Sequence, residues 1–356
     1  MKVSHIEKIA DAVLYEGYIL YPYRPSSVKN QQRWNFGALY PESYSLAQRG
    51  TESWTMQTEC LVQQTPLTTL EVRVRFLHLL AREIGVPIAD SGVRIVDTDS
   101  SMSRSDFHSV PSLEVNGRLF QTWQEAVERH VSLPAISFDQ PADLTRATFS
   151  FPASESIEPL TAADSGEIIG ALLRRQQAIE GTIELNVSKL ELGNACRVTV
   201  KILNRTPFGD AADKSRDEAL MRSFVSTHTI LSVHDGKFVS LLDPPEEFAQ
   251  AAGDCNNIGT YPVLAGEEGS HDCVLSSPII LYDYPQIAPE SAGSLFDGTE
   301  IDEILTLRIM TLTEEEKREM RGADDRARQI LERTESLAVE QFMKMHGAMK
   351  GVNRKS

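Results

Sequence analysis

Side chains of the types that bind metals gather in one short stretch of this chain. Residues 255–273 contain Cys255, Glu267, Glu268, His271, Asp272 and Cys273. Mixed Cys, His and carboxylate ligands suit iron or zinc, whereas carboxylates alone suit magnesium or calcium. Glu268 and His271 have the E-x-x-H spacing that di-iron proteins place on one helix face, but two nearby glycines argue against a helix. The stretch predicts a loop-built metal site, and the alternative is a solvated acidic loop with small buried cysteines.

One histidine outside this stretch is the best nitrogen ligand in the chain. His228 occurs in the apolar run of residues 226–231, which is typical of a strand. Buried beside the acidic stretch it would serve as a metal ligand or a general base, and otherwise it is a core histidine. The sequence therefore predicts an iron site, with zinc as the alternative, and its ligands in order of preference are Cys255, His228 and Glu268, then Glu267 and His271.

The charge distribution is uneven. Residues 238–307 contain no Lys or Arg and hold thirteen carboxylates, so this segment supplies −13 of the formal net charge of −16. Clustered carboxylates repel one another unless a cation or a basic partner is present. A bound metal or basic groups from elsewhere would neutralise them, and a solvated face is the alternative. A second cluster in the segment does not match the calcium-loop consensus: Glu290, Asp297, Glu300, Asp302 and Glu303.

Residues 17–40 have the opposite character. They contain no acid, and Arg24, Lys29 and Arg33 are interleaved with six aromatic residues. Such interleaving can bind nucleic acid, but three charges are few and the acidic remainder repels phosphates. No nucleic-acid partner is predicted. Docking of residues 17–40 against the acidic segment is favoured, and binding of a small anion is the next alternative.

Several common functions have no signature here. The chain lacks GxGxxG, P-loop GKS/T, GxSxG and HExxH motifs, so no nucleotide cofactor is expected and no catalytic residue is assigned. There is neither an 18-residue apolar run nor a signal-peptide pattern, which predicts a cytoplasmic protein without a membrane partner. In that compartment the four cysteines are expected as free thiols or metal ligands rather than disulfides.

The elements that must position these residues are mostly strands. The 356 residues, with 41% hydrophobic and 24% charged content, exceed one typical domain. The pattern predicts an α+β fold of mostly antiparallel β-sandwich or barrel-like domains with a C-terminal helical segment. The expected domains are a β-rich α+β domain at 1–136, a sandwich-like domain with a long acidic loop at 137–312, and a helical appendage at 313–356.

Local signals predict individual elements. Strands are expected at 55–64, 70–80, 145–151, 167–189, 195–204, 274–282 and 301–310. In residues 70–80, acidic and basic residues alternate with apolar ones, which indicates one wet face. Asn116-Gly117 and Asp235-Gly236 predict hairpin turns. Helices are expected at 121–131 and 213–225, and after Thr313, which precedes three glutamates and caps a helix.

A wider resemblance rests on several strings taken together. These are residues 10–18, 21–24, 29–37, 240–245, 262–264, 276–283 and 301–308. Over most of its length the chain resembles an uncharacterised family of bacterial proteins that is often encoded near nickel-iron hydrogenase structural and maturation genes. The resemblance implies an accessory role in hydrogenase assembly, metal supply or redox support, with a hydrogenase subunit or maturation factor as the partner.

Three hypotheses follow from these observations. The first is a metal-binding accessory protein for nickel-iron hydrogenase maturation or function. The second is a metal-free assembly protein whose acidic 238–307 surface docks on a basic patch of its partner. The third is an enzyme with a loop-built acid/base site for a small molecule.

Overall fold

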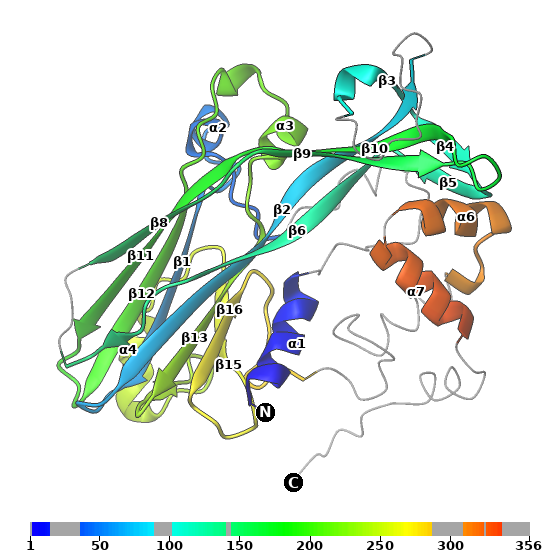
Figure 1. Cartoon of the computed structure of the whole chain (residues 1–356). Coiled ribbons are helices and arrows are strands. Elements are labelled where there is room, and N and C mark those ends of the chain that lie inside the picture. The colour runs from blue at the N-terminus through cyan, green and yellow to red at the C-terminus, as the bar shows by residue number, and fades with distance from the viewer. Residues whose placement is uncertain are drawn as a thin grey trace.

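The computed structural model describes residues 2–14, 36–88, 102–139, 144–286, 309–323 and 325–336. Two large open sheets dominate this part of the chain, and helices are few (Figure 1). Every strand pairing among the described residues is antiparallel. The predicted β-rich α+β class is therefore confirmed, as open sheets rather than a closed barrel.

The first sheet has five strands in the order β14-β1-β12-β11-β8. Its strands are β1 (Thr55–Gln63), β8 (Thr145–Phe151), β11 (Ile179–Lys189), β12 (Ala195–Asn204) and β14 (Lys237–Val239). β11 and β12 pair over nine residues each, and β12 pairs with the whole of β1. The short β14 covers only the last three residues of β1 and forms an end of the sheet.

The second sheet has nine strands, with β15-β16-β13-β2-β10-β9 as its main order and β3, β6 and β7 also paired with β2. Its strands are β2 (Thr69–Pro87), β3 (Phe107–Val110), β6 (Trp123–Ser132), β7 (Ile136–Ser137), β9 (Ser154–Thr161), β10 (Ile168–Gln176), β13 (Val225–His234), β15 (Tyr261–Leu264) and β16 (Cys273–Ser277). The 19-residue β2 pairs with β13 along its first half and with β10 and β3 toward its end.

The remaining elements are short. β4 (Ser112–Val115) and β5 (Arg118–Gln121) form a separate hairpin around Asn116-Gly117, as predicted. The helices are α1 (Lys2–Leu14), α2 (Glu42–Ala47), α3 (Arg216–Leu220), α4 (Ala249–Gly253), α6 (Glu314–Ala323) and α7 (Asp325–Ser336), with 3-10 turns η2 (Arg104–Asp106), η3 (Ala211–Asp213) and η4 (Glu246–Phe248). None of these helices is long and apolar enough to cross a membrane.

The main core lies between the two sheets. Alternate residues of β2, including Val72, Val74 and Phe76, face alternate residues of β1, β11 and β12, because successive side chains of a strand point to opposite faces. An aromatic group closes one part of this core, where the Phe76 ring lies 4.7 Å from Phe224 and 5.8 Å from Phe149. The two sheets therefore pack face to face as a sandwich.

The opposite face of β2 was predicted to be wet, and it is so in part: the side chains of Glu71 and Arg73 are 58% and 42% exposed, whereas helix α1 lies over Arg75. From this helix, Glu7 binds Arg73 at 3.2 Å, and Asp11 binds Arg75 at 2.6 Å. Only 11% of the Arg75 side chain is exposed. The i,i+4 spacing of the two helix acids spans about 6 Å, close to the i,i+2 spacing of two strand residues, so both pairs form at once.

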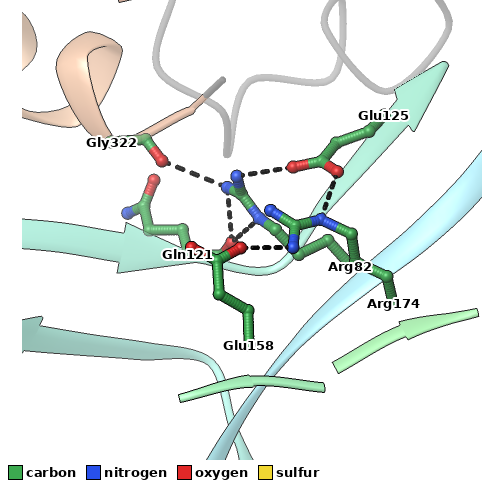
Figure 2. A network of polar contacts seen from close by, with 6 residues as sticks. All are labelled: Arg82, Gln121, Glu125, Glu158, Arg174 and Gly322. Carbon is green, nitrogen blue, oxygen red and sulfur yellow. Dashed lines mark hydrogen bonds and ion pairs between the residues drawn. The ribbon is translucent and has the colours of Figure 1, made fainter. Parts of the chain in front are cut away.

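A buried polar network holds α6 against the second sheet (Figure 2). Arg82 on β2 has 3% of its side chain exposed and donates to Glu125 on β6 at 2.9 Å. It also donates to the backbone carbonyls of Gln121 at 2.9 Å and of Gly322 near the end of α6 at 3.1 Å. Arg174 on β10 binds the other oxygen of Glu125 at 2.7 Å. Five elements, β2, β5, β6, β10 and α6, are thus tied together through two guanidinium groups.

Two further features fix α6. Thr313 and Glu316 form the capping box at its start: the Thr313 hydroxyl accepts from the Glu316 N–H at 3.2 Å, and the Glu316 carboxylate accepts from the Thr313 N–H at 2.9 Å. This confirms the predicted cap. Near the other end, a Cβ on Gly322 would stand 1.7 Å from the backbone oxygen of Leu119. Glycine is required there because the helix backbone lies directly on β5.

Three local predictions were wrong, the first two because tertiary pairing decided the structure. Residues 121–131, expected as a helix, are mostly β6, which pairs with β2 over ten residues. Asp235-Gly236 is a tight turn, with Asp235 at φ +53°, but it carries the chain from β13 in one sheet to β14 in the other and closes no hairpin. The strand expected at 274–282 ends at Ser277, because Pro278 has no N–H to donate.

Other sequence-based predictions concern the domain boundary and two segments that are only partly described. The division at 136/137 stays a prediction about domains, and both sheets combine strands from the two sides of it, since β1 pairs with β12 and β2 with β10. Residues 301–308 of the expected strand 301–310 lie outside the described residues, and Ile309 and Met310 are helical. Residues 17–35 of the basic aromatic segment also lie outside the described residues. Its end contacts the acidic segment, since Gly37 lies against Pro278.

Candidate functional site

Cys255 lies on the outer face of the five-stranded sheet. It follows α4 and packs among Leu61, Phe248 and Ala251, and its thiol donates to the Ala251 carbonyl at 3.5 Å. Burial raises the pKa of the Cys255 thiol to about 11. It is a free thiol, as are the three other cysteines. A protonated thiol in an apolar setting is a packing group rather than a nucleophile.

His228 lies on the other side of the sandwich. It is fully buried on β13, opposite Arg75, on the face that α1 covers. Its Nδ1 lies 2.9 Å from the Ser226 carbonyl, and Nε2 has no hydrogen-bond partner. Burial lowers the pKa of His228 to about 4, with the Arg75 charge acting in the same direction. Because Cys255 and His228 occupy opposite outer faces, the structure does not bring these two predicted ligands together.

The other three predicted ligands lie in the turn between β15 and β16. Glu267 and Glu268 are exposed, while the Nδ1 of His271 lies 2.9 Å from the Phe238 carbonyl and the Phe238 N–H donates to the His271 carbonyl at 2.7 Å. The turn carries glycines at φ +109° and +81°, so Glu268 and His271 are not on a helix, as their sequence context indicated. His271 therefore joins the β15–β16 turn to β14 of the other sheet.

The described residues do not form the predicted metal site. They contain no group of three or more His, Cys, Asp or Glu side chains that could hold a metal ion. The Glu290 to Glu303 carboxylates lie outside the described residues. Iron or zinc binding stays a prediction.

The described part of the acidic segment lies at one end of both sheets. It supplies the end strand of both sheets, β14 in the first and β15 in the second, and α4 lies between them in the chain. The hydrogen bonds between Phe238 and His271 join the two ends. We name the described residues 238–286 the acidic edge. Its exposed carboxylates make no ion pair with a described Lys, Arg or His: Asp243, Glu246, Glu247, Asp254, Glu267 and Glu268.

Large apolar side chains accompany these carboxylates. The acidic edge is less than a fifth of the described residues, yet it carries five of the eleven large hydrophobic side chains that are exposed there. They are Leu242, Ile258, Tyr261, Ile280 and Tyr282, and Tyr282 is 87% exposed. Apolar and aromatic side chains framed by charges are typical of protein-binding surfaces.

The backbone beneath this surface is held rigidly. Asp283 accepts from the Ser240 hydroxyl at 2.5 Å and from the Leu264 N–H at 2.7 Å, so one carboxylate ties three parts of the edge together. In the sandwich interior the Ser276 hydroxyl lies 2.7 Å from both the Thr58 and the Thr260 hydroxyl. These bonds connect β1 with β16 and the start of β15. A preorganised surface loses little conformational entropy when a partner binds.

A cavity of about 420 Å³ adjoins the acidic edge beneath α1. Its ionisable lining residues are Glu7, Glu71, Arg73, His234, Asp272 and Cys273. The lining contains three carboxylates, Glu7, Glu71 and Asp272, and one guanidinium, Arg73, so it has an excess of negative charge. Burial raises the pKa of the Cys273 thiol to about 11, which leaves it protonated at neutral pH. The cavity suits a cationic group better than covalent chemistry.

Sequence reasoning missed the pairing of α1 with β2 that frames this cavity. The available signal was the i,i+4 spacing of Glu7 and Asp11 and the i,i+2 spacing of Arg73 and Arg75. No family model matches the chain, and no curated protein shows significant similarity to it. The link to nickel-iron hydrogenases therefore stays a prediction from the quoted strings.

Proposed function

We propose that this protein is an assembly or interaction protein that docks through its acidic edge on a basic surface of another protein. The observation that carries the proposal is that the acidic edge combines six exposed carboxylates, which make no ion pair among the described residues, with five exposed large apolar side chains. The carboxylates supply attraction and orientation, and the tyrosines and aliphatic residues supply burial.

The cavity beneath α1 gives the partner a specific contact. Asp272, Glu71 and Glu7 line it above an apolar floor that includes Ile230 and Val233. A lysine or arginine side chain of the partner would place its aliphatic stem on this floor and its charge among the carboxylates. The resemblance adds a hydrogenase subunit or maturation factor as the first partner to test.

Charge neutralisation tests this proposal. We expect the variant with Glu246, Glu247, Glu267 and Glu268 replaced by Gln to bind its partner about tenfold more slowly and with a weaker dependence on salt. A matched control neutralises four other exposed glutamates that form no ion pair among the described residues: Glu155, Glu167, Glu180 and Glu191. The assay is association of the purified chain with purified nickel-iron hydrogenase subunits and maturation factors between about 50 and 500 mM salt.

Equal losses in both variants would refute docking through the acidic edge, because both change the net charge by the same amount. The absence of association with any of these components would refute the hydrogenase assignment. Metal analysis of freshly purified protein, prepared anaerobically without chelator, separates the proposal from the metal-binding hypothesis. About one iron or zinc per chain, lost on Cys255→Ala or His228→Ala, would favour metal binding instead.

A further inference from the structure

Arginines gather in a cavity at the other end of the molecule. The cavity has a volume of about 640 Å³ and lies between the β4–β5 hairpin and helices α6 and α7 (Figure 1). Its charged lining is Arg118, Arg318, Arg321, Arg328, Glu314 and Glu315. Four guanidinium groups against two carboxylates give the lining a positive excess, in a chain whose formal net charge is −16. We name this cavity the arginine pocket.

Three elements bring these arginines together. Arg118 is the first residue of β5 after the Asn116-Gly117 turn, Arg318 and Arg321 lie on α6, and Arg328 lies on α7. The Arg82 network holds the end of α6 on the sheet (Figure 2). The arginines are therefore presented by packed elements.

The arginines differ in how well they are already neutralised. Arg321 donates to both oxygens of Glu335, at 2.9 and 2.8 Å, and Arg328 lies 3.8 Å from Glu332, so both of these arginines are paired. Arg318 is only 4.0 Å from Glu114, at the limit of an ion pair. Arg118 has no carboxylate partner among the described residues: its guanidinium lies 4.7 Å from the centre of the Phe120 ring, and its buried Nε has no hydrogen-bond partner.

We propose that the arginine pocket binds a small molecule that carries a phosphate chain. A guanidinium offers a planar fork of donors that matches phosphate oxygens. Forks that arrive from three elements suit the tetrahedral oxygens of phosphate better than the two coplanar oxygens of a carboxylate. The volume is within the range of small-molecule sites, whereas the acidic remainder of the chain repels an extended polyanion such as nucleic acid.

This site is independent of the proposed docking function. The acidic edge lies beside the first half of β2, and the arginine pocket lies beyond its second half, where Arg82 contacts α6. The two surfaces use different residues and opposite charges. Loss of one binding activity therefore leaves the other testable.

Calorimetric titration of the full chain with inorganic pyrophosphate at fixed ionic strength tests the proposal. We expect saturable binding of one pyrophosphate per chain, weakened about tenfold or more by Arg118→Gln. Among the described residues, Arg118 has no ion pair that the substitution would break. Arg146→Gln is the control, since Arg146 is an exposed arginine paired with Glu184 elsewhere on the surface, and we expect it to change the affinity by less than about twofold.

Circular dichroism will show whether the Arg118→Gln variant folds. If it does not, Arg318→Gln is the second variant, and it should also weaken pyrophosphate binding. The proposal is overturned if the wild-type chain shows no saturable pyrophosphate binding at millimolar concentration. Equal weakening by Arg146→Gln would also overturn it, because that result would identify a general charge effect. Tighter binding of citrate than of pyrophosphate would overturn the phosphate assignment.

Discussion

Replacement of Arg82 by methionine is the sharpest test of how the C-terminal helices are held. Methionine keeps most of the aliphatic volume of the side chain and removes the guanidinium. The substitution would remove the donors to Glu125, to the Gln121 carbonyl and to the Gly322 carbonyl. Glu125 would retain Arg174, which binds its other oxygen at 2.7 Å. The carbonyls would lose this donor in a buried setting.

The expected loss of stability follows from these contacts. Removing one partner of a buried ion pair typically costs about 3–5 kcal/mol, and a buried carbonyl left without a donor costs about 1–3 kcal/mol. Because Arg174 continues to neutralise Glu125, the cost of Arg82→Met should lie toward the lower end of the range for a broken buried ion pair. We expect the free energy of unfolding to fall by about 3 kcal/mol.

The control is Arg146→Met on the surface. Arg146 forms an ion pair with Glu184 at 2.6 Å, but its side chain is 58% exposed, so its loss should cost less than about 1 kcal/mol. Urea denaturation measures the two free energies of unfolding. Hydrogen exchange then locates the effect, and we expect amide protection in α6 to fall more than protection in β11 and β12.

Two results would refute this reasoning. A free energy of unfolding for Arg82→Met within about 1 kcal/mol of that for Arg146→Met would show that burial does not make the network important. Unchanged exchange of α6 amides would show that the bond to the Gly322 carbonyl does not hold the helix.

Further predictions concern acid stability, α6 packing and thiol reactivity. His78 and His228 are buried, and burial lowers their pKa values from 6.5 to about 4. Because the unfolded chain takes up these protons first, the free energy of unfolding should fall as pH drops from 6.5 toward 4, by up to about 3 kcal/mol per histidine. A thermal midpoint that does not change over this pH range would contradict the prediction. Gly322→Ala should destabilise α6 by a few kcal/mol, at the scale of strong overpacking, and an unchanged exchange rate for that helix would contradict the contact with β5. Cys255 and Cys273, whose pKa values are raised to about 11, should react with iodoacetamide at pH 8 far more slowly than a free cysteine, and rates equal to that of free cysteine would contradict their burial.

The fold class followed from the sequence because local patterns and tertiary structure agree over most strands. The alternation in residues 70–76 predicted which residues of β2 face the core. It could not show that α1 lies over Arg75 on the other face, because this depends on a helix some 60 residues earlier in the chain. Asp235-Gly236 marked a turn correctly, but the local sequence does not state which sheet the next strand joins.

The candidate site was harder to predict than the fold. Spacing in the sequence grouped Cys255 with His271 and added His228, whereas the sandwich separates Cys255 and His228 onto opposite faces. The segment itself stands out by its composition, since a long absence of Lys and Arg is visible without a structure. Its role as the end strand of both sheets depends on pairings with β1 and β13 that no local signal encodes.

The carboxylates that flank the end strands β14 and β15 have an alternative explanation, although neither strand itself contains an acidic residue. Edge strands expose unpaired backbone groups, and proteins often place charges on them to prevent aggregation. That role predicts carboxylates without exposed apolar neighbours, because Leu242, Tyr261 and Tyr282 would themselves promote association. The two explanations differ in one measurable respect. If the charges only prevent aggregation, neutralising Glu246, Glu247, Glu267 and Glu268 should make the isolated chain associate with itself. If they bind a basic partner, the isolated variant should keep its sedimentation behaviour and lose only the salt-dependent association.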